Sequence, residues 1–167
     1  MTELDHIVKQ LKLQPHPEGG FYKETYRSEG LITEDNLDND IEGMRHYSTA
    51  IYFLLTSDNF SALHRIKQDE IWHFYKGSPL KLHIISPEGV YSMVIIGNHL
   101  EEAEVPQYTV TARSWFAAEV LNDNAHTLVG CTVSPGFDFR DFELADKENL
   151  CSKFPQHRNI IERLTRD

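Results

Sequence analysis

Apolar residues near the start of the chain recur every three to four positions, at Leu4, Ile7, Val8 and Leu11. This period places them on one face of a helix. Thr2, followed by Asp5 three positions later, is typical of a capping box, in which each residue satisfies a free backbone N–H group. These patterns predict a short amphipathic helix over about residues 3–12, ended by the Pro and Gly residues that follow.

The middle of the chain changes to short β-branched and aromatic runs, some of them alternating with polar residues. The strands predicted from these runs cover residues 21–27, 47–56, 62–67, 70–76, 80–86, 90–97, 106–110, 115–120 and 127–134. Turn-forming residues separate them, as in Ser57-Asp58-Asn59 and Ser86-Pro87-Glu88-Gly89. Many short strands at this spacing predict an all-β sandwich or barrel.

Polar and helical segments surround the predicted strands. Residues 29–43 are polar and acidic, which predicts a surface loop or excursion that could serve as a lid or as a dimer arm. Asp146 is a cap for a helix running to about Lys153, and Pro155 suits the first turn of a second helix. No repeat or linker interrupts the chain, so we expect a single domain over residues 1–167.

Composition excludes several classes of function. The formal net charge is -10, from 16 basic and 26 acidic residues, and nucleic-acid backbones require clustered Lys and Arg. No segment approaches the about 20 apolar residues that span a bilayer, and the first residues lack a basic leader, so we expect a cytoplasmic protein. Cys131 and Cys151 show no metal-binding or disulfide spacing, and Cys131 lies in an apolar run typical of the core.

Residues with chemical potential concentrate in one stretch, 64–77, with the sequence HRIKQDEIWHFYKG. His64 and Ile66 share one face of their predicted strand. Glu70 begins the next strand after a tight connection, so it could face His64 across the interior of a closed sandwich. An imidazole that faces a carboxylate can form an acid–base pair or two ligands of a metal. The alternative is a pair of hydrogen-bonded surface groups.

This stretch resembles the first cupin motif, His-x-His-(x)3-Glu-(x)6-Gly, with Ile66 in place of the second His. Residues 112–117 are similar to the second motif, Pro-x-Gly-x-x-His, and there Ala117 stands at the metal-binding His. Only His64 and Glu70 remain of the four usual ligands, and a stable site generally needs three or more. No cofactor is therefore expected. A weakly bound divalent metal, with Glu119 or His73 as a substitute ligand, is the alternative.

Longer strings are similar to the cupin-5 family, an RmlC-like branch of unknown function. These strings are residues 16–28, 64–77, 115–119 and 130–143. The resemblance implies an all-β fold, the cupin double-stranded β-helix or jelly roll, to which the pattern adds short N- and C-terminal helices. It also implies a homodimer, and a pocket like that of the sugar-nucleotide epimerases among these proteins.

Candidate roles follow from the motif and this implied pocket. We expect His64 to act as general base, with Glu70 orienting or charging it, and Tyr75 or Glu119 to act as the acid. The residues expected to bind substrate are Arg27, Trp72, His73, Phe74, Trp115 and Glu119. Strict alternation from Glu70 turns His73 to the opposite face, unless a bulge reverses it. The segment from His16 to Gly20 is expected to be a tight turn with a structural His.

Three functional hypotheses remain open at this point. The first is an isomerase or epimerase that acts on a carbohydrate-like or sugar-nucleotide substrate by His/Glu acid–base chemistry, and it rests on analogy of fold. The second is a noncatalytic module that binds a small metabolite in an aromatic-lined pocket. The third is a metal-dependent cupin enzyme, which Ile66 and Ala117 disfavour. All three involve a small-molecule ligand, and none involves a nucleic acid or a membrane.

Overall fold

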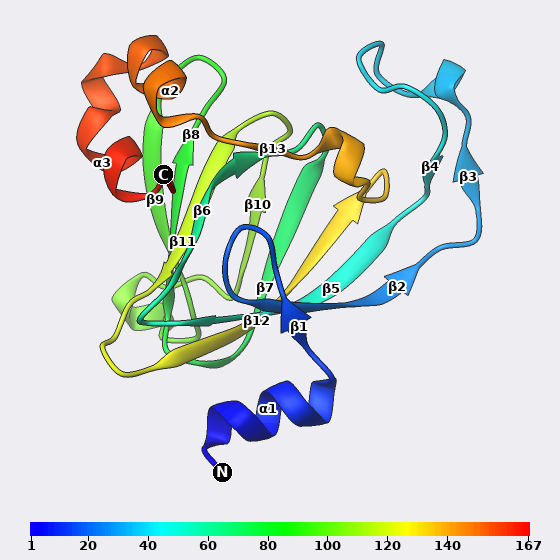
Figure 1. Cartoon of the computed structure of the whole chain (residues 1–167). Helices are drawn as coiled ribbons and strands as arrows, with labels where there is room; N and C mark the ends of the chain where they lie inside the picture. The colour runs from blue at the N-terminus through cyan, green and yellow to red at the C-terminus, as the bar shows by residue number, and fades with distance from the viewer.

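Two antiparallel sheets pack face to face in the computed structural model, which describes residues 1–167 (Figure 1). One sheet has six strands in the order β1-β2-β5-β12-β7-β10, and the other has five in the order β13-β6-β11-β8-β9. A small pair, β3-β4, stands apart. The predicted all-β jelly roll with short terminal helices is confirmed.

The strands lie close to the predicted ranges. Their bounds are β1 (Gln14–Pro15), β2 (Phe21–Arg27), β3 (Leu31–Ile32), β4 (Arg45–His46), β5 (Thr49–Thr56), β6 (Phe60–Arg65), β7 (Asp69–Gly77), β8 (Leu80–Ile85), β9 (Tyr91–Ile96), β10 (Gln107–Val110), β11 (Trp115–Val120), β12 (His126–Ser134) and β13 (Glu143–Leu144). The four strands that the pattern does not predict have two residues each, too few to show alternation.

Helices cover the outer faces of the sheets (Figure 1). Helix α1 (Glu3–Leu11) begins with the predicted capping box and packs Ile7 against Leu54 of β5. Helices α2 (Lys147–Lys153) and α3 (Arg158–Arg163) cover the five-stranded sheet, and Pro155 begins a 3-10 turn before α3. The other 3-10 turns are η1 (Glu34–Asn36), η2 (Leu100–Glu102) and η3 (Phe139–Asp141). No helix has both the length and the hydropathy needed to cross a bilayer.

The main core fills the space between the sheets. Strand β11 shows how its residues are divided, because Phe116, Ala118 and Val120 enter this core. Its other face, with Trp115 and Ala117, packs against residues of the C-terminal helices. Alternation along a strand therefore assigns each β11 residue to one of two separate environments.

The acidic segment 29–43 forms most of an excursion that leaves the sandwich after β2 and returns through β4 (Figure 1). Asp38 and Asp40 pair with the Arg113 guanidinium at 3.0 and 2.6 Å, and Glu34 accepts a hydrogen bond from the Gly43 N–H. The predicted surface excursion is therefore an ordered one, and it delivers Arg45 back to the body of the protein.

Candidate functional site

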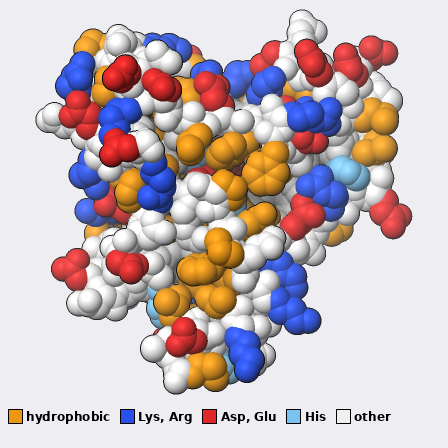
Figure 2. Space-filling model, viewed as in Figure 1, with side chains coloured by type: hydrophobic (Ala, Val, Ile, Leu, Met, Phe, Trp, Pro, Cys, Tyr) orange, Lys and Arg blue, Asp and Glu red, His pale blue; other side chains and the backbone are white.

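A cavity of about 490 Å³ opens between the two sheets at one end of the sandwich. Its lining includes Glu18, His64 and Glu70, together with aromatic residues and the apolar Ile66. Figure 2 shows hydrophobic side chains gathered around a hollow near the centre of this face. A concave, mostly apolar site with a few convergent polar groups is the usual form of a small-molecule pocket.

Glu18 reaches the cavity from the turn between β1 and β2. Gly19 and Gly20 both have positive φ, at 108° and 80°, a conformation that residues with a side chain rarely adopt. The turn is fixed on β6, because the Ala62 N–H donates to the Glu18 carbonyl at 2.9 Å. Since Ala62 precedes His64 by two residues on the same strand, this bond places the Glu18 carboxylate beside the imidazole.

His64 uses both of its ring nitrogens inside the protein. Nδ1 lies 2.7 Å from the Ala62 carbonyl oxygen, which only accepts hydrogen bonds, so Nδ1 carries a proton. Nε2 lies 2.8 Å from Glu18 Oε2. At that distance one proton lies between the two atoms, on the imidazole or on the carboxyl group. The ring is 3% exposed and lies between Phe116 and Phe142, with centroids 4.1 and 5.3 Å away.

The pKa directions show which partner holds this proton. Burial opposes charge on His64, but the Glu18 carboxylate outweighs burial and raises the pKa of the imidazole. Burial also disfavours ionised Glu18, yet the charge and hydrogen bond of His64 lower the pKa of the carboxyl group. The pair therefore exists as an imidazolium and a carboxylate. We call His64 and Glu18 the cavity dyad.

His16 stands beside the dyad in a neutral form. Its Nδ1 accepts a hydrogen bond from the Glu18 N–H at 3.2 Å. Burial lowers the pKa of His16, although Glu18 pulls it in the other direction. Its ring packs edge-on against Tyr22 with centroids 4.5 Å apart. The predicted structural role of His16 fits these contacts, and the ring also lines the cavity.

Glu70 lies on the opposite wall, near the start of β7. Glu70 is 9% exposed. Burial raises the pKa of its carboxyl group to about 7, although the positive charge of His64 acts against this rise. Cys131 of β12 is its neighbour, and burial and Glu70 raise the pKa of that thiol well above its usual value. The cavity thus holds an ion pair on one wall and, on the other, a carboxyl group that changes charge near neutral pH.

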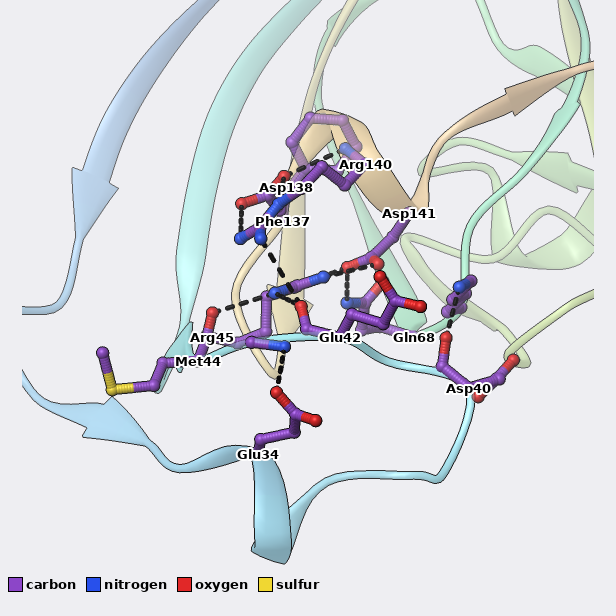
Figure 3. Close-up of polar contacts among 12 residues, drawn as sticks. Glu34, Asp40, Glu42, Met44, Arg45, Gln68, Phe137, Asp138, Arg140 and Asp141 are labelled. Carbon is purple, nitrogen blue, oxygen red and sulfur yellow. Dashed lines mark hydrogen bonds and ion pairs between the residues drawn. The ribbon is translucent and has the colours of Figure 1, made fainter.

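An aromatic loop roofs the cavity with Phe137, Phe139 and Phe142. Asp141 in this loop accepts two hydrogen bonds of 2.8 Å from Arg45 and one of 2.6 Å from Gln68. Figure 3 shows these three side chains pointing toward one another. Arg45 and Asp141 are both buried, so this paired charge fixes the roof to the returning acidic excursion.

Arg27 is the third predicted site residue that lines the cavity, after His64 and Glu70. It lies at the end of β2, where its Nη2 donates to Glu24 at 2.6 Å and to the Phe137 carbonyl at 3.1 Å. Alternation turns His64 and Glu70 inward, but it would turn Arg27 away from the face of Tyr22 and Glu24. An irregularity in the pairing of β2 with β5, between Glu24 and Tyr26, brings Arg27 back to the cavity.

Two other predicted residues of β7 point away from the cavity. Tyr75 is 51% exposed and packs edge-on against Tyr52 on the outer face of the six-stranded sheet. His73 lies on the same outer face, where its Nε2 is 3.0 Å from the Thr132 hydroxyl. Alternation from Glu70 therefore holds as far as Tyr75, and the structure does not bring Tyr75 or His73 to the dyad.

Trp72 and Phe74 point inward but lie deeper than the cavity. Trp72 is 1% exposed and packs edge-on against Phe53 and Phe116, with centroids 6.0 and 6.2 Å away. Phe74 packs against the same core. These rings close the sandwich below the cavity and are absent from its lining.

The remaining predicted residues, Trp115 and Glu119, lie on the outer face of β11. Trp115 packs in the core beneath the C-terminal helices, with the Arg65 guanidinium 4.4 Å from its ring centre. Glu119 bonds His83 and Arg163 instead of facing the interior. Ala117 lies on this outer face as well. The β11 residue paired with His64 across the sheet is Phe116. The proposed alignment of Ala117 with an inward metal ligand is therefore corrected.

The residues present do not fit the metal that cupin motifs usually hold. No three His, Cys, Asp or Glu side chains converge in a way that could hold a metal ion. Ile66 lines the cavity where a second His is expected, and both His64 nitrogens are already bonded. The substitute ligands Glu119 and His73 lie outside the cavity. We therefore derive no chemistry through a metal.

Glu18 is the residue that the sequence reasoning missed. The turn itself is expected, but the sequence shows no contact between residue 18 and a strand 46 positions later. The sequence gives only a weak signal, which is a carboxyl group in the turn Pro17-Glu18-Gly19-Gly20. Such turns most often belong to solvated loops.

Comparison with known proteins identifies relatives over most of the chain. A family model described as Cupin superfamily (DUF985) matches residues 5–145. The uncharacterized protein YML079W of Saccharomyces cerevisiae is 29% identical over 149 residues, covering 84% of this chain and 74% of that protein.

Solved structures extend the likeness to the whole chain. A hypothetical protein from Leishmania major has a TM-score of 0.90 and 36% identity, and protein SO0799 from Shewanella oneidensis has 0.86 and 39%. The alignments cover 99% of this chain, with 100% of the first structure and 99% of the second. The oxalate decarboxylase from Bacillus subtilis at pH 4.6 has a TM-score of 0.55 at 13% identity, over 90% of this chain and 36% of that one, a likeness of fold alone.

Proposed function

This chain belongs to the DUF985 family of the cupin superfamily, and from this premise we propose that it is a metal-independent isomerase or epimerase of a small carbohydrate-like molecule. The observation that carries the proposal is the cavity dyad facing Glu70 across a pocket of small-molecule size.

The arrangement changes the roles that the motif suggests. His64 has no free nitrogen lone pair, because its two nitrogens bond Ala62 and Glu18. Glu70 is the carboxyl group that changes protonation near pH 7, which suits a general base or acid at that pH. We therefore assign proton transfer to Glu70 and charge stabilisation to His64, which Glu18 keeps protonated.

The proposed reaction begins when ionised Glu70 removes a proton from a carbon next to a carbonyl group. The electron pair of the broken C–H bond moves toward the carbonyl oxygen. The positive charge of His64 acts on the developing negative charge through space, because both of its N–H groups are bonded to Ala62 and Glu18. Glu70 then returns the proton to the former carbonyl carbon while the hydroxyl proton passes to the former carbonyl oxygen, which gives the isomer. Return to the original carbon gives the epimer only when the proton reaches the opposite face. The product has the same composition as the substrate, so no oxidant or cofactor is needed.

The test follows the exchange of carbon-bound hydrogen with solvent. Aldoses and ketoses of four to six carbons are incubated with the protein in D2O, and loss of the proton signal next to the carbonyl is followed by NMR. Glu70→Gln should slow exchange at least about 100-fold, the usual range for a lost general base. Glu119→Gln is the matched control, since it alters a His–Glu pair outside the cavity.

The exchange experiment also separates the alternative function. A sugar that raises the melting temperature of the protein without any exchange would identify a noncatalytic binding module. The aromatic roof of the cavity favours that module as the second candidate.

The homodimer and the cytoplasmic location expected from the sequence remain part of this proposal. Tyr26 and Tyr75 are 56% and 51% exposed, and exposed aromatic residues are frequent at interfaces between subunits. Analytical ultracentrifugation tests the dimer: a mass of twice 19.3 kDa is expected, and a mass of 19.3 kDa at micromolar concentration would exclude a stable one.

A further inference from the structure

The charges around the cavity are paired within the protein. At the mouth, Glu24 accepts hydrogen bonds of 3.1 and 2.6 Å from Arg27, and Asp138 accepts bonds of 3.0 and 2.9 Å from Arg140. Inside, Glu18 is paired with His64 at 2.8 Å. A ligand that enters therefore meets ion pairs, each with its own counter-charge.

Arg27 is the only Arg or Lys among the residues that line the cavity. Recognition of a phosphate or carboxylate group normally uses the two-pronged fork of a free guanidinium. Here Nε and Nη2 of Arg27 are both bonded to Glu24, and Nη2 also donates to the Phe137 carbonyl. The fork is therefore occupied, and Nη1 alone remains.

Apart from Arg27 and His64, which are paired with Glu24 and Glu18, no side chain that lines the cavity carries a positive charge. His16 is a neutral acceptor, because its Nδ1 takes the Glu18 N–H and burial lowers the pKa of its ring. Burial keeps Glu70 largely protonated up to about pH 7, and ionised Glu70 adds a negative charge. A phosphate inside the cavity would face carboxyl groups on both walls, and the cation there, His64, already has Glu18 as its counter-charge.

The other lining groups suit a molecule that alternates apolar and hydroxyl surfaces. Tyr22, Phe137, Phe139 and Phe142 supply ring surface, and the carboxyl groups of Glu18 and Glu70 supply hydrogen-bond acceptors. Rings of polyhydroxy compounds present C–H faces to aromatic residues and hydroxyl edges to such acceptors.

We infer that the cavity takes an uncharged polyhydroxy carbonyl compound and discriminates against phosphorylated sugars and sugar nucleotides. The inference rests on the proposed function for the place of the site, and it narrows the substrate class that the family resemblance suggests.

Matched pairs of compounds test this inference. Erythrose, ribose and glucose are each compared with their terminal phosphates, and glucose also with glucosamine, by titration calorimetry on the wild-type protein. At least one uncharged sugar should bind, and at least tenfold more tightly than its phosphate or amine. Two results would overturn the inference: tighter binding of a phosphate or of glucosamine, or no binding of any uncharged sugar up to about 100 mM, far above the millimolar range of weak ligands.

A variant tests the occupied guanidinium directly. Glu24→Gln releases Arg27, so the ratio of phosphate affinity to uncharged-sugar affinity should rise at least fivefold. Glu143→Gln is the matched control, because it releases Arg65 from a 2.7 Å pair outside this cavity and should leave the ratio unchanged. An unchanged ratio in Glu24→Gln would show that pairing of Arg27 does not set the selectivity.

The substrate class and the proposed reaction can fail separately. If an uncharged sugar binds but exchanges no carbon-bound hydrogen in D2O, the substrate class stands and the isomerase proposal falls. If a phosphorylated sugar binds more tightly and exchanges its hydrogen through Glu70, the isomerase proposal stands and the uncharged class falls.

Discussion

Two histidines of the five-stranded sheet form His–Glu pairs that look alike by distance and behave in opposite ways. His64 Nε2 lies 2.8 Å from Glu18, and His83 Nε2 of β8 lies 2.7 Å from Glu119 of β11. The pKa of His64 is raised by its carboxylate against the effect of burial. Burial lowers the pKa of His83 in spite of its carboxylate.

The remaining partners explain the difference. His64 Nδ1 faces a carbonyl oxygen, which can only accept, so the ring needs two protons. His83 Nδ1 lies 2.7 Å from the Tyr91 hydroxyl, which can donate, so a neutral ring satisfies both bonds. Arg163 also donates two 2.8 Å bonds to Glu119 and neutralises it, whereas the carboxylate of Glu18 has no Arg or Lys partner.

This comparison shows that a short His–carboxylate distance does not by itself define a catalytic pair. The charge state of each histidine also depends on the group that bonds its other ring nitrogen and on any cation that bonds the carboxylate. These groups come from elements far apart in the sequence. His64 is paired by a loop residue and faces the cavity. His83 belongs to a network that joins α3 to the sheet and has no part in that lining.

The largest expected difference is in stability after removal of each carboxylate. Glu18→Gln leaves the buried His64 without its counter-charge and should lower the free energy of unfolding at pH 7 by about 3 kcal/mol. Glu119→Gln should cost about 1 kcal/mol or less, because Arg163 is half exposed and can be solvated. Urea unfolding of both variants measures this difference, and equal losses would contradict the distinction between the pairs.

Glu70→Gln should stabilise the protein above neutral pH. The pKa of Glu70 is about 7 in the folded protein, against an ordinary value of 4.5, so stability falls as pH rises between these values. The full difference corresponds to about 3 kcal/mol, and we expect a gain of about 2 kcal/mol at pH 8. Glu88→Gln, at an exposed turn, is the control. A Glu70→Gln protein that is no more stable than wild type at pH 8 would count against the buried carboxyl group.

The two histidines should respond to pH with opposite signs. Because the folded pKa of His64 is raised, its contribution is complete below about pH 6.5 and is lost as pH rises through the folded value. His83 has a lowered pKa, so its contribution is lost as pH falls below about 6.5. His64→Gln should therefore cost more at pH 5.5 than at pH 8, and His83→Gln the reverse. Unfolding free energies at the two pH values test both signs.

The smallest expected effect comes from a substitution that should make the His83–Glu119 pair more like the His64–Glu18 pair. Arg163→Leu removes the neutralising guanidinium from Glu119, so the pKa of His83 should rise while stability falls by less than about 1 kcal/mol. NMR titration of the His83 ring protons provides the measurement. If the pKa of His83 stays in place, the Tyr91 hydroxyl and burial are sufficient to keep the ring neutral.

Much of the fold could be predicted from the sequence because its signals are local. The range 115–120 matches β11 in full, and the Thr2–Asp5 capping box begins α1. Alternation also predicts that Glu70 faces inward and His73 outward. Each of these features depends on residues within a few positions of one another.

The site was harder to predict because it depends on contacts between distant segments. His64 and Glu70 stand out in the motif, but the charge of His64 comes from Glu18, which is 46 residues away. Tyr75 has suitable chemistry for an acid, while alternation from Glu70 already turns it outward. The motif alignment expects Ala117 and Glu119 to face inward. In the structure Phe116 is the β11 residue paired with His64, so Ala117 and Glu119 face outward.

The contact that holds the Glu18 turn also sets an order of events during synthesis. Arg166 Nη2 donates to the Glu18 carbonyl at 3.3 Å and to Asn59 Oδ1 at 2.8 Å, across 148 and 107 residues. At the usual rate of about 5–20 residues per second, Glu18 leaves the ribosome about 7 to 30 seconds before Arg166. The Arg166 bond to the turn can therefore form only late in synthesis, whereas the Ala62 and His64 partners of Glu18 leave the ribosome far earlier.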